Sequence, residues 1–353
     1  MKRQWLRLLW PPSWFAVFSS AKGFSSHPVL GSSTLNAWGL HAWRKSLAER
    51  LCQARRKRMR AKLPVTLTAQ WDKNGYVRVD DFLDPDELAA LGHELAEATF
   101  PVVEMEQPPA LTRRANLDAQ TCSGSYPALN RVITDSMLLG LLHYAAGYRG
   151  RPTVAVQCIH SDRDDPHGQH DPQTDWHVDT FHSTAKAWLF LHPVSADEGP
   201  LAYVTGSHKQ TESRLRWEQA QSVVAASHAN ALHAKGSFRA SDAELAAMGY
   251  ADHMVAAVPA NTLIVADTGG FHRRMPSPHS TVRVEIYFSL RRNPFFAGLY
   301  PSLLALPWLR NHWAGAAFVL YKWLHKRGTP LWIPSVKTGL NEVEKQTLRR
   351  SVG

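Results

Sequence analysis

Five short apolar segments separated by turn residues constrain the fold of this chain more than any other feature. They lie at residues 153–159, 185–194, 200–205, 261–267 and 281–290. Short runs of this kind, rich in β-branched and aromatic residues, are typical of strands in a β-sandwich or barrel. A sixth segment, "YVRVDDFL" at 76–83, alternates apolar and polar residues as a half-buried strand does. We therefore expect a mainly β core.

Helical patterns flank and interrupt these strands. The periodicity predicts helices within residues 40–62, after Asp84-Pro85, within 135–147 and within 210–250. In the first, Leu40, Trp43, Leu47 and Leu51 share one face, which we expect to be buried. Residues 210–250 are polar and separate two strands, which is the position of a lid or substrate loop.

Charge divides the chain into three parts. Residues 1–62 carry a balance of +12, residues 291–353 a balance of +8, and the residues between them −10. Nine of the 13 tryptophans also lie in the two basic parts. Trp with Lys and Arg is typical of segments at an anionic membrane surface. The alternatives are solvated basic faces and, less favoured because no nucleic-acid module is present, nucleic acid.

These shifts predict a basic N-terminal segment at 1–64, a central domain at 65–292 with the insertion 210–250, and an amphipathic C-terminal segment at 293–353. Three distant cysteines form no framework, which favours a reducing compartment. We expect a cytoplasmic protein with peripheral membrane contact. Organelle targeting is the alternative, because the first acid is Glu49.

The segment "DWHVDT" at 175–180 predicts part of a metal site. Residues i and i+2 of a strand share a face, so His177 and Asp179 converge. Two imidazoles and one carboxylate hold a metal while leaving positions open for oxygen and a co-substrate. His272, which follows the 261–267 strand through a Gly-Gly turn, supplies the second imidazole. Arg283, on the return strand, offers a fork that binds the far carboxylate of a dicarboxylate co-substrate.

These residues resemble the phytanoyl-CoA dioxygenase family of Fe(II)- and 2-oxoglutarate-dependent oxygenases. The likeness covers about residues 68–292. Its motifs are "NGYVRVDDFLDPDEL", "WHVDT", "DEGPLAYVTGSHK" and "FHRRM…VRVEIYFS".

The resemblance implies a double-stranded β-helix, or jelly roll, that binds Fe(II), 2-oxoglutarate and O2. His177, Asp179 and His272 would be the catalytic metal ligands, and Arg283, Trp188 and Gln157 would face oxoglutarate. The reaction implied is hydroxylation of a C–H bond in a small or lipid-linked substrate, since halogenases of this type lack the carboxylate of Asp179. The alternative is a non-catalytic jelly-roll module at a membrane surface.

The sequence leaves more than one role open for several neighbouring residues. Arg273 and Arg274 depart from the family pattern; they could receive an anionic substrate group or pair with surface acids. Asp175 and Asp267 could orient the ligand imidazoles. The remaining histidines nearby are expected in loops or around the site: His160, His167, His170 and His182.

Overall fold

A computed structural model describes residues 11–122, 124–161, 170–299, 303–327, 332–335 and 338–349. His167, Trp5 and Trp10 lie outside these residues. The longer helices are α3 (Leu40–Met59), α4 (Val65–Asn74), α5 (Pro85–Glu97), α7 (Pro127–Thr134), α8 (Ser136–Ala146), α9 (Glu212–Val224), α12 (Pro307–Lys326) and α13 (Glu342–Arg349). The shorter helices are η1 (Pro11–Phe18), α2 (Ser33–Ala37), η2 (Arg60–Lys62), α6 (Ala119–Cys122), η3 (Ala225–Ser227), α10 (Ala231–Ala234), α11 (Asp242–Ala247) and η4 (Leu303–Ala305).

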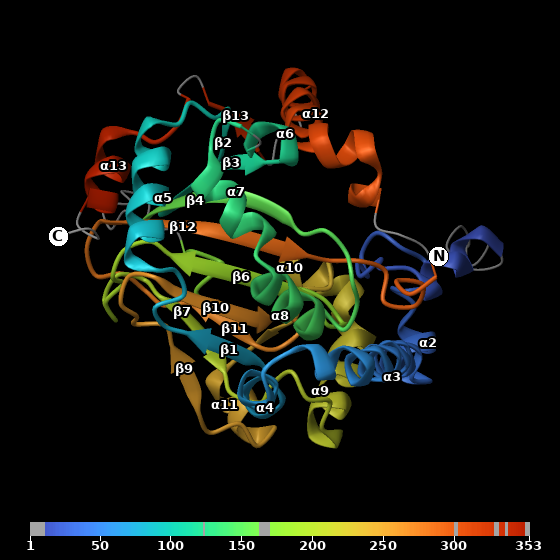
Figure 1. The fold of residues 1–353 in the computed structure, drawn as a ribbon. Coiled ribbons are helices and arrows are strands. Elements are labelled where there is room, and N and C mark those ends of the chain that lie inside the picture. The colour runs from blue at the N-terminus through green and yellow to red at the C-terminus, as the bar shows by residue number, and fades with distance from the viewer. Residues whose placement is uncertain are drawn as a thin grey trace.

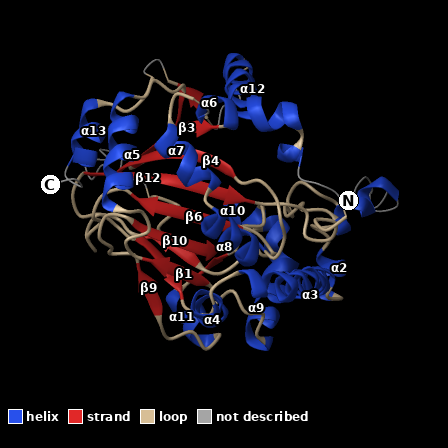
Figure 2. Cartoon of the chain, in the orientation of Figure 1, coloured by secondary structure: helices blue, strands red, loops and turns tan. Residues whose placement is uncertain are grey.

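Two antiparallel sheets form the core (Figures 1 and 2). The larger has the order β1 (Tyr76–Val79), β10 (Thr262–Asp267), β6 (Ala185–Phe190), β12 (Thr281–Leu290), β4 (Thr153–Ser161), β3 (Ala110–Leu117), β2 (Val102–Gln107) and β13 (Ile333–Pro334). The smaller has the order β8 (Arg239–Ala240), β5 (Trp176–His177), β11 (His272–Arg274), β7 (Leu201–Val204) and β9 (His253–Val255).

The path of the chain between the sheets defines the fold as a double-stranded β-helix. From β4 onward the chain crosses to the smaller sheet at β5, returns at β6, and crosses again at β7. It then returns at β10, crosses at β11 and returns at β12. This alternation confirms the jelly-roll core, and the six predicted strand segments are β4, β6, β7, β10, β12 and β1. The β2–β3 hairpin was not predicted.

Strand β12 separates the apolar core from the interior of the jelly roll. Val284, Ile286, Phe288 and Leu290 pack in the main core with residues of α8. The alternate positions, which begin at Arg283, face the space between the sheets, because successive side chains of a strand point to opposite faces. The alternation places charged residues inside the molecule without disturbing the core.

Helix α3 packs on the domain with a face that only partly coincides with the predicted one, because Leu47 and Leu51 pack against Phe181 and Phe295 while a neighbouring, more polar face is buried more deeply. Its buried residues include Ala48, Cys52, Arg44 and Arg56, whereas Trp43 is about half exposed. The arginines can be buried because backbone carbonyls accept their hydrogen bonds. Arg44, for example, donates to the carbonyls of residues 16, 17, 19 and 21.

The C-terminal helix α12 lies at the periphery of the molecule (Figure 1). Of its described residues only Ala314 is buried, and Trp308, Val319, Leu320 and Trp323 are exposed. Among the described residues, no helix is both long and apolar enough to cross a membrane.

Candidate metal centre

The structure brings His177, Asp179 and His272 together between the two sheets. Strand β11 pairs with β5 so that His272 lies directly opposite His177, and their ring centroids are 4.4 Å apart. Asp179 lies just beyond β5, and its Oδ1 is 3.8 Å from Nε2 of His272. One ligand atom from each residue lies within 4.8 Å of the other two. This spacing is close to that of donors around a single ion, each about 2.1 Å from the metal.

Backbone carbonyls orient both imidazoles. Nδ1 of His177 lies 2.8 Å from the carbonyl oxygen of Asp175, and Nδ1 of His272 lies 3.0 Å from that of Gly270. An Nδ1–H that donates to a carbonyl leaves the Nε2 lone pair for a metal. Neither the Asp175 nor the Asp267 carboxylate orients a ring of the triad. The Asp175 carboxylate pairs with His170, and Asp267 faces the backbone and Arg56.

The protonation states of the three residues also fit a divalent cation. Burial lowers the pKa of His177 well below its usual value, and it lowers the pKa of His272 as well. Burial alone would raise the pKa of Asp179, but Lys186 and the two imidazoles hold it well below its usual range. Neutral imidazoles and an ionised carboxylate are the forms that bind a metal. The triad therefore needs no loss of protons at neutral pH to accept the ion.

A cavity of about 560 Å³ adjoins the triad, and Arg283, Trp188 and Gln157 all line it. Arg283 donates from Nη1 to the carbonyl of Gly199 at 2.7 Å, and its Nε lies 2.9 Å from Oε2 of Glu285. These contacts use Nη1 and Nε, which leaves Nη2 for a ligand. The three residues thus share one cavity with the triad, and their roles toward oxoglutarate stay predictions that are taken up below.

A row of polar side chains crosses three strands on the floor of the cavity. Arg114 on β3 donates from Nε to Gln157 Oε1 at 2.6 Å, and Gln157 on β4 donates to the buried Glu285 on β12. The three residues are paired across adjacent strands, so register alone aligns them. Glu285 then holds the guanidinium of Arg283. Gln157 therefore fixes the position of two charged residues as well as lining the cavity.

Sequence reasoning missed two lysines beside Asp179. Lys186 on β6 places Nζ 2.7 Å from Asp179 Oδ2, and Lys22, in the loop after η1, donates to the backbone oxygen of Asp179. Lys186 has a sequence signal, since it interrupts the apolar strand "AKAWLF" two residues before Trp188. Lys22 has none, because 157 positions separate it from Asp179.

The other residues named from the sequence make different contacts. Arg274 pairs with Asp171 at 3.0 Å, whereas Arg273 stacks on the Trp176 ring. Arg273 has no acidic partner among the described residues. His160 binds Glu344, and His182 is buried with Nδ1 against the carbonyl of Ser183.

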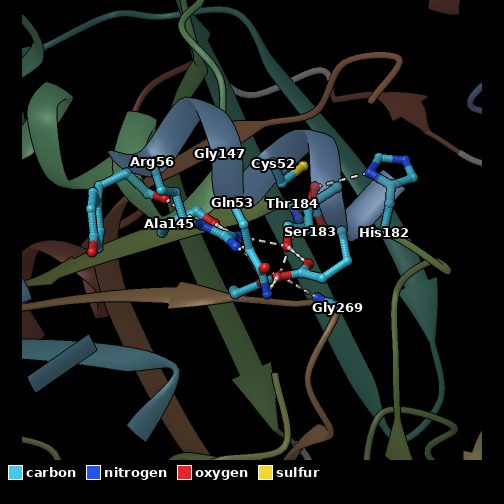
Figure 3. A network of polar contacts seen from close by, with 12 residues as sticks. Cys52, Gln53, Arg56, Ala145, Gly147, His182, Ser183, Thr184 and Gly269 are labelled. Carbon is cyan, nitrogen blue, oxygen red and sulfur yellow. Dashed lines mark hydrogen bonds and ion pairs between the residues drawn. The ribbon is translucent and has the colours of Figure 1, made fainter. Parts of the chain in front are cut away.

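A buried network of polar contacts connects α3 with residues next to the metal centre (Figure 3). Arg56 lies 3.0 Å from Glu49 and 3.6 Å from Asp267, and it donates to Ser183 Oγ at 2.7 Å. Asp267 accepts from the backbone N–H groups of Thr184 and Gly269, at the end of β10. The next residue, Thr268, accepts from the backbone N–H of Asp179 at 2.9 Å.

A larger, more open hollow of about 750 Å³ lies between α3, α4, α8 and α9. Its lining includes Glu49, Arg56 and Trp71 but none of the triad. Volume alone would therefore select this hollow as the candidate site, although it contains none of the triad. The triad marks the smaller cavity as the candidate site.

A double-stranded β-helix with two histidines and one aspartate around an inner cavity defines the class of non-haem iron oxygenases that use 2-oxoglutarate. Residues 71–243 match the family model described as phytanoyl-CoA dioxygenase (PhyH), which identifies this part of the chain as a PhyH domain. The match includes His177 and Asp179 and ends before His272 and Arg283. The chain is accordingly an Fe(II)- and 2-oxoglutarate-dependent dioxygenase.

Solved structures similar to this chain include the epimerase SnoN with Fe3+, alpha ketoglutarate and nogalamycin RO, at 17% identity and a TM-score of 0.40, covering 64% of this chain and 81% of that one. HygX from Streptomyces hygroscopicus with nickel and 2-oxoglutarate has 15% identity and a TM-score of 0.40, covering 64% and 86%. The carbocyclase SnoK has 15% identity and a TM-score of 0.38, covering 64% and 83%. No curated protein sequence matches the chain.

Proposed function

We propose that this enzyme hydroxylates an unactivated C–H bond of a small or lipid-linked substrate and releases succinate and CO2. The observation that carries the proposal is the juxtaposition of His177, Asp179 and His272 at one cavity that also contains Arg283. The three residues would hold Fe(II). When bound, that ion supplies the activation of O2 coupled to decarboxylation of 2-oxoglutarate.

The residues of the chain orient the co-substrate and exclude water. Arg283 binds the far carboxylate of oxoglutarate, because a guanidinium fixed by Glu285 and Gly199 is already oriented toward the cavity. Trp188 is buried and forms a wall with Tyr287, its cross-strand neighbour. The carboxylate of Asp179 occupies a coordination position that a halide would need, which favours hydroxylation over halogenation.

Metal and oxoglutarate binding test the proposal before any substrate is known. Calorimetry with Mn(II) and oxoglutarate should show one site of each in the wild-type chain. Asp179→Ala should abolish metal binding, while Asp171→Ala, at an acid outside the triad that pairs with Arg274, should retain it. Oxoglutarate conversion to succinate with Fe(II) should follow the same pattern. A wild-type chain that binds neither ligand would instead support a non-catalytic binding module.

Contact with an anionic membrane is part of the proposal for a lipid-linked substrate. It is supported by α12, which exposes Trp308 and Trp323 and contains no acid. Sedimentation with liposomes containing phosphatidylserine should recover the protein, and phosphatidylcholine liposomes should not. Trp308→Ser with Trp323→Ser should reduce recovery several-fold, and Val224→Ser, at a similarly exposed site on α9, should not. Equal recovery of all variants would exclude α12 as the contact.

A further inference from the structure

The cavity is strongly cationic. Seven of its lining residues carry a positive charge, and only Asp179 carries a negative one; the cations are Lys22, Arg114, Lys186, Arg273, Arg274, Arg283 and Arg291. Two of these cations already pair with acids outside the cavity lining, Arg283 with Glu285 and Arg274 with Asp171, which leaves five cations facing one carboxylate. Iron and oxoglutarate do not balance this remaining excess, because the two charges of the metal offset the two of the dicarboxylate. A further anion is therefore needed for electrostatic complementarity.

The cations form two groups at opposite ends of β12. Arg283 begins the inward-facing row, whereas Lys186 pairs with Ser289 near the other end of the strand and Arg291 follows its last residue. An oxoglutarate molecule that bridges Arg283 and a metal at Asp179 has both of its carboxylates engaged there. It therefore leaves Lys22 and Arg291 without a counter-anion.

The second group surrounds Asp179. Burial lowers the pKa of Lys22 to about 8, and the charges of Arg291, Lys186 and Arg239 act in the same direction, against Asp179. Lys186 already pairs with Asp179. Among the described residues, Arg291 donates only to the carbonyl of Ser20, at 3.4 Å. Once a metal takes up the charge of Asp179, Lys22 and Arg291 have no acid to neutralise them among the described residues.

We propose that the substrate carries a phosphoryl group that binds between Lys22 and Arg291, at the end of the cavity opposite Arg283. This inference rests on the proposed function. Arg supplies a fork and Lys a point charge, and both bind phosphate well. A phosphoryl group held there leaves the adjoining part of the substrate beside Asp179, near the metal. Lys22 also gives the N-terminal segment a direct role, because it forms one wall of the substrate site.

Calorimetry with the full chain loaded with Mn(II) and oxoglutarate tests the proposal. The soluble probes are inorganic phosphate and phenyl phosphate, with phenol as the uncharged control. The lipid probe is a phosphatidic acid vesicle, compared with phosphatidylcholine. Arg291→Gln and Lys22→Gln should each weaken phenyl phosphate about 10-fold or more, the loss expected when a charge-assisted hydrogen bond is removed. Arg292→Gln, at the next residue and outside the cavity, should bind as the wild type does.

A crossed comparison separates this inference from the proposed function. Arg283→Gln should weaken oxoglutarate and spare phenyl phosphate, whereas Arg291→Gln should do the reverse. Binding of soluble phosphates, or of phosphatidic acid alone, supports the proposal and identifies a soluble or a lipid-borne source. If the wild type binds oxoglutarate but no phosphate probe, or if Arg291→Gln and Lys22→Gln bind like Arg292→Gln, the phosphoryl site is wrong while the oxygenase assignment stands.

Discussion

Lys186 balances the charge of Asp179 when no metal is bound. Its Nζ contacts Oδ2, while Oδ1 faces His272. An ammonium there stabilises the metal-free carboxylate but repels an incoming cation. The residue therefore sets a compromise between stability of the metal-free enzyme and affinity for metal.

Replacement of Lys186 should reveal this compromise. Lys186→Met leaves the partly buried carboxylate of Asp179 uncompensated, so we expect the metal-free protein to lose about 1 kcal/mol of stability. Added Mn(II) should then raise the Tm more than it does in the wild type, because the metal replaces the missing charge. Differential scanning calorimetry measures both quantities. Lys186→Arg should behave like the wild type, and an equal metal-induced shift in the Met variant would contradict the idea.

The metal ligands could be predicted from sequence, whereas their charged surroundings could not. His177 and Asp179 are two positions apart, and His272 and Arg283 are linked by one turn, so strand periodicity brings them together. Lys22 reaches Asp179 only through the path of an N-terminal loop. No local pattern encodes such a contact.

At the scale of elements, α3 is attached to the catalytic domain by buried polar groups as well as by part of its predicted apolar face, Leu47 and Leu51. Arg56 donates to the carbonyls of Tyr144 and Ala145, both at 2.9 Å, and to Ser183. Figure 3 shows Arg56 reaching from α3 toward these groups. Helical periodicity missed this face because it assumes that charged side chains remain in solvent.

Loss of Arg56 should therefore be costly. Arg56→Met would leave Glu49 and Asp267 without their shared cation, and removal of one partner from a buried ion pair costs about 3–5 kcal/mol. Arg58→Met, on the exposed side of the same helix, should change stability by less than about 0.5 kcal/mol. Urea denaturation gives both values. Similar losses in the two variants would mean that the network contributes nothing beyond a surface charge.

The strands were predictable for a related reason. β4, β6 and β10 are mostly apolar runs, so composition alone identifies them. The β2–β3 hairpin contains Glu104 and Arg113, which pair across the strands and lie 3.0 Å apart. Each of these two segments contains charged residues, so neither resembles a strand when it is considered alone. The charges neutralise each other only once the two strands are paired.

At the scale of the whole molecule, buried histidines should make stability depend on pH. Burial lowers the pKa of His182 to about 3 and that of His233 to about 4, so both are neutral in the folded protein at pH 5. The unfolded chain protonates these residues below pH 6.5. The folded state therefore loses stability as the pH falls from about 6.5, by about 2 kcal/mol per histidine at pH 5.

Unfolding measured between pH 7 and pH 5 tests this dependence. His182→Asn keeps a donor near the position of Nδ1 and removes the titrating group. Between pH 7 and pH 5, we expect the free energy of unfolding of this variant to fall by about 2 kcal/mol less than that of the wild type, the contribution of one histidine. This difference does not depend on the stability of the variant at pH 7. His93→Asn, at an exposed histidine on α5, is the matched control. A His182→Asn slope equal to that of the wild type would place the acid sensitivity elsewhere.

The groups that aim the two imidazoles belong to the peptide backbone. Changing the side chain at position 175 leaves its carbonyl in place, so the tautomer of His177 tolerates mutation there. Position 270 is restricted for another reason, since a Cβ on Gly270 would come within 2.0 Å of the Tyr203 hydroxyl. Cavity residues could therefore be substituted to accept new substrates without reorienting the two imidazoles. The condition is that the backbone conformation at positions 175 and 270 is preserved.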